Sequence, residues 1–230
     1  MKKYLFIRFL CLCAAALLYV SCAGMRGPKY PNMLADMDPF SLGSVTASLD
    51  QILSSEIREA SLEVIFYPRE NEVLLEFDHG VSQYWQFWNE AGRRQFIQAL
   101  SSYKDDFANR RLDTRFNRSR AIYGRFKGRF HWKPLSFSPL YKASPEILLG
   151  YRFRGDAPYF SASQLRSKEE TGINRGGVDE SPAYSIYFTR AQGDELAHLF
   201  DQAYLLGLLP EVYTPPAASD PSRDVYIRQQ

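Results

Sequence analysis

The sequence predicts an α+β fold, in which a mostly antiparallel sheet of about six strands carries two longer helices and one short N-terminal helix. Aromatic residues are abundant, with 15 Tyr, 16 Phe and 3 Trp among 230 residues, and they favour strands and half-buried surfaces. Strand-like runs are interrupted by single helical patterns without regular alternation. This order is typical of helices that cover one face of an antiparallel sheet.

Residues 1–21 have the pattern of a secretory signal peptide. Lys2, Lys3 and Arg8 accompany an apolar run, 9–20, that is shorter than the roughly 20 residues of a membrane-spanning helix. The run ends in YVSC, which resembles the lipobox of bacterial lipoproteins in the relaxed form found in spirochaetes. The resemblance implies cleavage between Ser21 and Cys22, a diacylglyceryl group on the Cys22 sulfur and an acyl chain such as palmitate on the freed amine.

A lipid on Cys22 would hold the protein in the cell envelope without a membrane-spanning helix. Ala23 stands where an inner-membrane retention signal would place Asp, which favours the outer membrane; the periplasmic and the surface face are both open. The alternative is ordinary cleavage after Ala23, which would remove Cys22 and release a soluble protein.

The chain after the signal divides into a tether, 22–44, a single α+β domain, 45–210, and an irregular tail, 211–230. Proline at positions 28, 31 and 39 predicts the tether, and proline at 215, 216 and 221 predicts the tail. In the domain, apolar residues at helical spacing predict a short helix over 46–61. The runs SLEVIFY and EVLLEFD, joined by PRENE, predict a β-hairpin.

An apolar stripe at spacings of three and four then predicts a helix over 84–107. Four further strands are expected at 119–133, 146–155, 157–163 and 182–188. A final helix is expected over 189–207, where Thr189 and Gln192 match a capping box.

The predicted strand at 119–133 alternates apolar residues at even positions with basic residues at odd positions. Residues 110–133 hold nine Lys and Arg and one Asp, for a net charge of +8, whereas the whole chain carries +2. A basic face of this kind attracts anions. We therefore expect a candidate anion-binding site at Arg125, Lys127, Arg129 and Lys133, for an anionic lipid, glycan or protein rather than nucleic acid. The alternative is a solvated face whose charges pair with acidic strands such as the one bearing Glu72 and Glu76.

Catalytic patterns are sparse. The three histidines, His79, His131 and His198, have no metal-ligand spacing, all three cysteines lie within the first 22 residues, and no nucleophile-elbow or phosphate-loop motif is present. We therefore expect no metal, no cofactor and no enzymatic activity. The predicted function is that of a lipid-anchored envelope protein that acts as a binding or structural module. The alternative is a cell-wall or carbohydrate hydrolase that uses paired carboxylates.

Overall fold

The structure is a computed structural model that describes residues 31–50, 57–113, 121–172 and 178–209. The chain separates into two units, Met1–Pro31 and Asn32–Gln230, and every strand and helix named below belongs to the second. Its strands are β1 (Phe40–Asp50), β2 (Ile57–Tyr67), β3 (Glu72–His79), β4 (Ser82–Asn89), β5 (Ile122–Lys127), β6 (Arg129–Lys133), β7 (Tyr141–Ala143), β8 (Glu146–Arg154), β9 (Ala157–Gln164) and β10 (Tyr184–Phe188). Its helices are α2 (Glu90–Ala108), α3 (Arg190–Phe200) and α4 (Gln202–Gly207).

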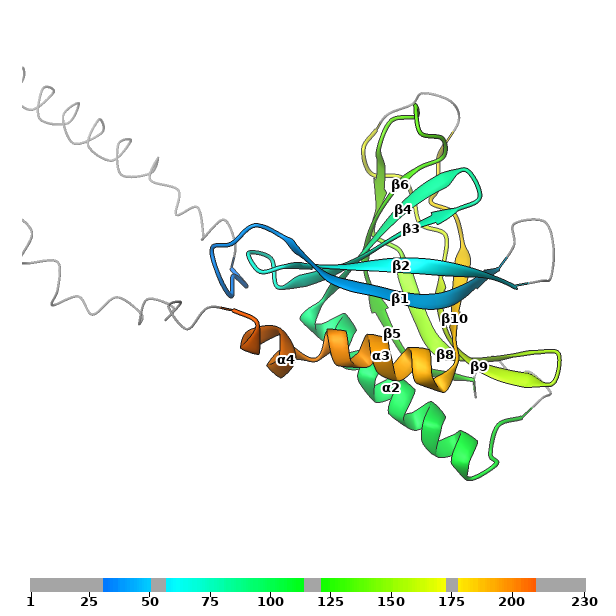
Figure 1. Cartoon of the computed structure of the whole chain (residues 1–230). Helices are drawn as coiled ribbons and strands as arrows, with labels where there is room; N and C mark the ends of the chain where they lie inside the picture. The colour runs from blue at the N-terminus through cyan, green and yellow to red at the C-terminus, as the bar shows by residue number, and fades with distance from the viewer. Residues whose placement is uncertain (1–30, 51–56, 114–120, 173–177, 210–230) are drawn as a thin grey trace, which may run out of the picture. The chain divides into compact units, whose positions relative to one another are not determined.

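The ten strands form one antiparallel sheet in the order β5-β8-β9-β10-β1-β2-β3-β4-β6-β7. The sheet curls into a half-barrel, and the helices lie together at one end of it (Figure 1). The predicted α+β fold of about six strands with two longer helices and a short N-terminal helix is therefore wrong. The domain is mostly strand, and its helices cover only part of the concave face.

The first error concerns residues 46–61, predicted as a helix. Residues 40–50 form β1, which pairs along its whole length with β2. Val45, Ala47 and Leu49 are buried and alternate with more exposed residues, which is the period of a strand. The compact unit also begins before the predicted boundary at residue 45, since Ala35 is already buried.

The predicted helix at 84–107 is half right. Residues 82–89 form β4, which pairs with β3 and β6, and the helix begins only at Glu90. Asn89 caps it, because its side-chain oxygen accepts a hydrogen bond from the Gly92 N–H at 2.8 Å. The predicted hairpin at 61–78 is confirmed by the pairing of β2 with β3.

The predicted strand at 119–133 is two strands: β5 is one edge of the sheet, and β6 is next to β7, the strand at the other edge. β5 pairs with β8, whereas β6 pairs with β4 and β7. The break falls at Gly128, where an added Cβ would lie 2.8 Å from the Ile147 side chain and 3.4 Å from the Phe87 carbonyl oxygen. Glycine allows the chain to pass directly from β5 to β6 at this close approach.

Both edges of the sheet have hydrogen-bond partners from outside it. The Arg125 N–H of β5 donates to the Gln95 side chain of α2 at 3.1 Å. The Lys142 carbonyl of β7 accepts from the Glu170 N–H at 2.9 Å. Such partners protect a sheet edge against pairing with another chain.

The predicted helix at 189–207 is confirmed in position but is interrupted at Asp201. Thr189 and Gln192 form the predicted capping box of α3. Asp201 ends α3 and caps α4, since its side chain accepts from the Tyr204 N–H at 2.9 Å. No helix in the described part of the chain is long and apolar enough to cross a membrane.

The core fills the space between the concave face of the sheet and the helices. An aromatic cluster from β4, β9, β10, α2 and α3 occupies its centre: Trp88, Phe96, Phe160, Phe188 and Phe200.

A network of hydrogen-bonded polar side chains also lies in the core. The Trp88 indole donates to Gln86, the Gln86 amide donates to Gln164, and the Tyr184 hydroxyl also donates to Gln164. This satisfied network ties β4 to β9 and β10 across the curl.

Candidate functional site

The predicted anion-binding residues keep their alternation but are divided between two strands. Phe126, Phe130 and Trp132 contact the core, and the basic residues between them point to the opposite side. Arg125 and Lys127 lie on β5, whereas Arg129 and Lys133 lie on β6. The structure therefore does not present the four residues as one continuous strand face.

Arg129 is bound to its neighbours on the outer face of the sheet. Its guanidinium pairs with Glu72 of β3, which is the acidic strand expected under the solvated-face alternative. The same guanidinium lies 4.0 Å from the centre of the Phe87 ring. Next to it, burial together with Arg129 and Lys142 lowers the pKa of His131 to about 4, so this imidazole is neutral at pH 7. Arg129 is thus a structural residue of this face.

Arg125 and Lys127 remain more available. Lys127 is exposed, and the Arg125 side chain is 63% exposed with Glu146 at 3.7 Å. A surface pair at this distance contributes little, so Arg125 can exchange its partner for a ligand. Arg125 is directly opposite Leu148 of β8 in the strand register.

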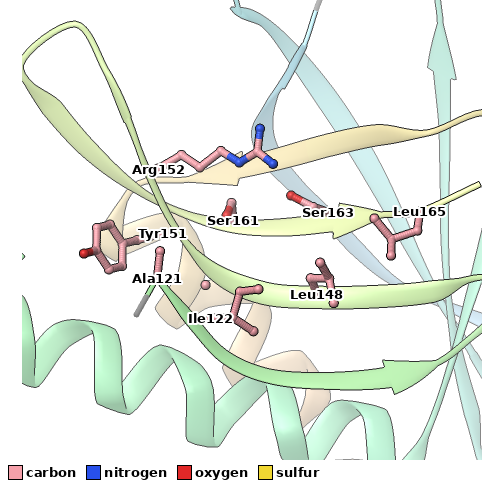
Figure 2. A pocket seen from close by; sticks show the side chains of 9 residues that line it. Ala121, Ile122, Leu148, Tyr151, Arg152, Ser161, Ser163 and Leu165 are labelled. Carbon is pink, nitrogen blue, oxygen red and sulfur yellow. The ribbon is translucent and has the colours of Figure 1, made fainter. Parts of the chain in front are cut away.

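Leu148 lines a pocket of about 200 Å³ on the outer face of β5, β8 and β9 (Figure 2). Its lining residues are Ala121, Ile122, Leu148, Gly150, Tyr151, Arg152, Ser161, Ser163 and Leu165. A register shift between Ile122 and Gly124 separates Ile122 from the inward-facing residues of β5. Gly150 and the two serines are small, and this leaves the hollow between the larger side chains around them.

The pocket combines an apolar floor with a cationic group and hydroxyls. Arg152 extends along one side of it, and Ser161 and Ser163 lie between Arg152 and Leu165 (Figure 2). The Ser163 hydroxyl is 2.8 Å from the Ser185 hydroxyl of β10, so these two groups share a hydrogen bond. An arginine beside a small apolar recess suits a ligand with an anionic group and a short apolar part.

A second pocket, of about 280 Å³, lies at the end of the sheet away from the helices. Its lining residues are Ser82, Tyr84, Trp132, Pro134, Arg166, Glu180, Ser181 and Pro182. The Arg166 guanidinium lies 3.7 Å from the Glu180 carboxylate, so the charged groups of this pocket already face each other. The described lining of the first pocket includes Arg152 and no Asp or Glu, which makes it the better candidate for an anion.

Catalytic groups do not converge at either pocket. Among the described residues, no cluster of three or more His, Cys, Asp or Glu could hold a metal ion. Glu63 and Glu76 are a pair of facing carboxylates on β2 and β3, and burial raises the pKa of Glu76. Neither of them lines the 200 Å³ or the 280 Å³ pocket.

Sequence reasoning missed Arg152, Ser161 and Ser163. One signal was available, since Gly150 interrupts the apolar run EILLGYRF and marks a close approach of another backbone. Ser21 and Cys22, the predicted cleavage and lipidation residues, lie outside the described residues, as do the signal peptide and the tail.

A family model described as "Uncharacterised Treponema protein" matches residues 39–206. No curated protein and no solved structure matches the chain. The matched region begins one residue before β1 and ends within α4, so it includes the whole sheet and the candidate pocket. The chain belongs to this family of Treponema proteins.

Proposed function

We propose that this protein is a lipid-anchored cell-envelope binding protein that holds an anionic ligand on the outer face of β5, β8 and β9. Anchoring is proposed from the lipobox-like YVSC, with Cys22 as the acylated residue and the outer membrane as the favoured location. Treponema is a spirochaete genus, and the family match supports this part because the lipobox has the relaxed spirochaete form. The domain needs no cofactor or metal for this role.

The observation that carries the proposal is one apolar pocket with a cationic group in its lining and two more cationic side chains on the adjoining strand β5. Arg152 borders the pocket directly. Arg125 lies beside Leu148, which lines it, and Lys127 follows on the same side of β5. Ile122, Leu148 and Leu165 can receive an apolar part of the ligand, and the cationic groups attract its anionic part.

Retention on heparin, a soluble sulfated polysaccharide, tests the proposal without any membrane. The triple variant Arg125→Ser/Lys127→Ser/Arg152→Ser should bind roughly tenfold more weakly, because each lost contact contributes about 0.5 kcal/mol or more. Binding should fall with rising salt for the parent protein. Circular dichroism and thermal unfolding verify that the variant is folded.

A matched control removes three exposed arginines elsewhere, at Arg58, Arg94 and Arg166. Its net charge equals that of the test variant, so a non-specific charge effect would weaken both equally. Equal weakening of the two variants, or no retention of the parent at low salt, would overturn the proposed site.

The second candidate function is a hydrolase that uses the facing carboxylates Glu63 and Glu76. It is favoured by the position of Glu63 directly opposite Glu76 in the strand register. Burial, and then the carboxylates of Glu63 and Asp78, raise the pKa of Glu76, and a hydrogen bond from Trp85 opposes this rise. Release of reducing ends from cell-wall glycans by the parent, and its loss in Glu76→Gln, would favour this function over binding alone.

A further inference from the structure

Two neighbouring loops at the end of the sheet away from the helices present exposed apolar side chains. Val81, in the β3–β4 turn, is 71% exposed, and Phe137, in the β6–β7 loop, is 84% exposed. Leu135 and Leu140 of the β6–β7 loop are exposed as well. We call these four residues the apolar tips. Single exposed apolar residues are ordinary, but several on adjoining loops mark an interaction surface.

The two loops are held side by side. β4 and β6 pair up to Gln83 and Lys133, and beyond that point the Ser82 hydroxyl donates to the Pro134 carbonyl at 3.0 Å. The β6–β7 loop (Figure 1) contains a turn in which the Ser138 N–H donates to the Leu135 carbonyl at 2.8 Å. Pro134 and Pro139 flank this turn and restrict its backbone. Phe137 is thus held outward by ordered backbone.

The charges around the apolar tips select the class of partner. Residues 79–83 and 133–143 contain Lys133 and Lys142 and no Asp or Glu, and the nearest acidic residue of the β3–β4 hairpin is the exposed Asp78, opposite Gln83. Burial lowers the pKa of His79 in the β3–β4 turn, which disfavours its charged form. The adjoining β9–β10 segment carries four acidic residues, Glu169, Glu170, Asp179 and Glu180, beside Arg166 and Lys168. Glu169 accepts hydrogen bonds from Thr171, Glu170 accepts one from Ser144, and Glu180 faces Arg166. Apolar tips with lysines behind them are typical of segments that enter the interface of an anionic bilayer.

We infer that the apolar tips dock on the surface of an anionic phospholipid bilayer, with Phe137 and Val81 entering the acyl-chain boundary and Lys133 and Lys142 at the headgroups. A lysine stem can lie along apolar surface while its ammonium group reaches the phosphates. This contact is separate from the proposed heparin-binding site on β5, β8 and β9, because it uses other strands and other residues. It would act as a second attachment beside a lipid at Cys22.

A local fluorescent label tests the inference in the full chain. Replacing Cys11, Cys13 and Cys22 by Ala removes every native thiol and the lipid, so Phe137→Cys can be labelled alone with the polarity-sensitive dye NBD. Vesicles of phosphatidylcholine with phosphatidylglycerol should raise NBD emission about twofold or more and shift it to the blue, and vesicles of phosphatidylcholine alone should do so less.

Two comparisons separate the loops from the rest of the chain. Ser101→Cys labels an exposed position on α2, at the helical end of the molecule, and should show no change with vesicles. In the Phe137→Cys chain, adding Val81→Ser, Leu135→Ser and Leu140→Ser should remove most of the rise, and Lys133→Gln with Lys142→Gln should make it insensitive to phosphatidylglycerol.

Three results would overturn the inference. The label at position 137 could stay unchanged with vesicles, the label at 101 could respond equally, or emission at 137 could rise with protein concentration in the absence of lipid. The last result would assign the apolar tips to a second copy of the chain. Heparin retention is independent of these readouts, so failure of one proposal leaves the other standing.

Discussion

Gly150 lies where the backbone of Ala121 leaves no room for a side chain. A Cβ at this position would be 1.9 Å from the Ala121 carbonyl oxygen, an atom that also accepts the Tyr151 N–H at 3.0 Å. Gly150→Ala would therefore push β8 away from the segment that leads into β5, in a region where two strands and the candidate pocket meet.

We expect Gly150→Ala to lower the free energy of unfolding by about 1–3 kcal/mol, the usual cost of overpacking. Urea unfolding followed by tryptophan fluorescence measures the change. Gly207→Ala is the control, because a Cβ there would meet no atom within 4 Å. An equal loss in both variants would show that the contact with Ala121 is not the cause.

Arg93 shows how one buried residue can connect elements that the sequence keeps apart. Its guanidinium donates to the carbonyl oxygens of Asn71 and Trp88, to the Asn71 side chain and to Gln202. Burial lowers its pKa to about 10, which still leaves it charged at pH 7. Arg93 thus holds the β2–β3 turn, the start of α2 and the start of α4 together.

At the scale of elements, the junction between β4 and α2 divides the aromatic stripe of residues 84–107 into a strand and a helix. Asn89 ends β4 and caps α2 through its bond to the Gly92 N–H. Trp85 and Trp88 continue the helical spacing of Phe96 and Tyr103 by coincidence, and this led the sequence prediction to extend the helix through β4.

Asn89→Ala should destabilise the domain by about 1 kcal/mol, because the first turn of α2 loses a side-chain acceptor. Asn89→Ser supplies another acceptor and should lose clearly less. Urea unfolding curves of the two variants measure the difference. If Asn89→Ala and Asn89→Ser were equally stable, the cap would not be a determinant of this boundary.

At the scale of the whole molecule, the proposed attachment to the envelope would depend on Cys22. The full-length parent, expressed with its signal, should yield a mature protein that begins at Cys22, carries added acyl mass and partitions into detergent. Cys22→Ala should lack the added mass and leave the detergent phase. Intact-mass spectrometry and phase partitioning are the measurements. A parent that begins at Gly24 without added mass would contradict the anchor and indicate a released protein.

The arrangement of the sheet shows how much of this fold could be predicted. The β2–β3 hairpin, the capping box at Thr189 and the in-and-out alternation from Arg125 to Lys133 were predicted, because each depends on residues close in the chain. The pairings of β1 with β10 and of β4 with β6 were not, because strands far apart in the sequence leave no local mark of their partner.

The candidate site was likewise predictable only in its local features. The sequence by itself determined that residues 110–133 are basic and that apolar and basic side chains alternate from Arg125 to Lys133. Only the tertiary structure decided that the chain changes strand at Gly128, so that Arg129 pairs with Glu72. It also placed Arg125 next to a pocket that is lined by Arg152, Ser161 and Ser163. The physical reason is that charge and side-chain period are properties of a short segment, whereas a pocket exists only where segments from different strands pack together.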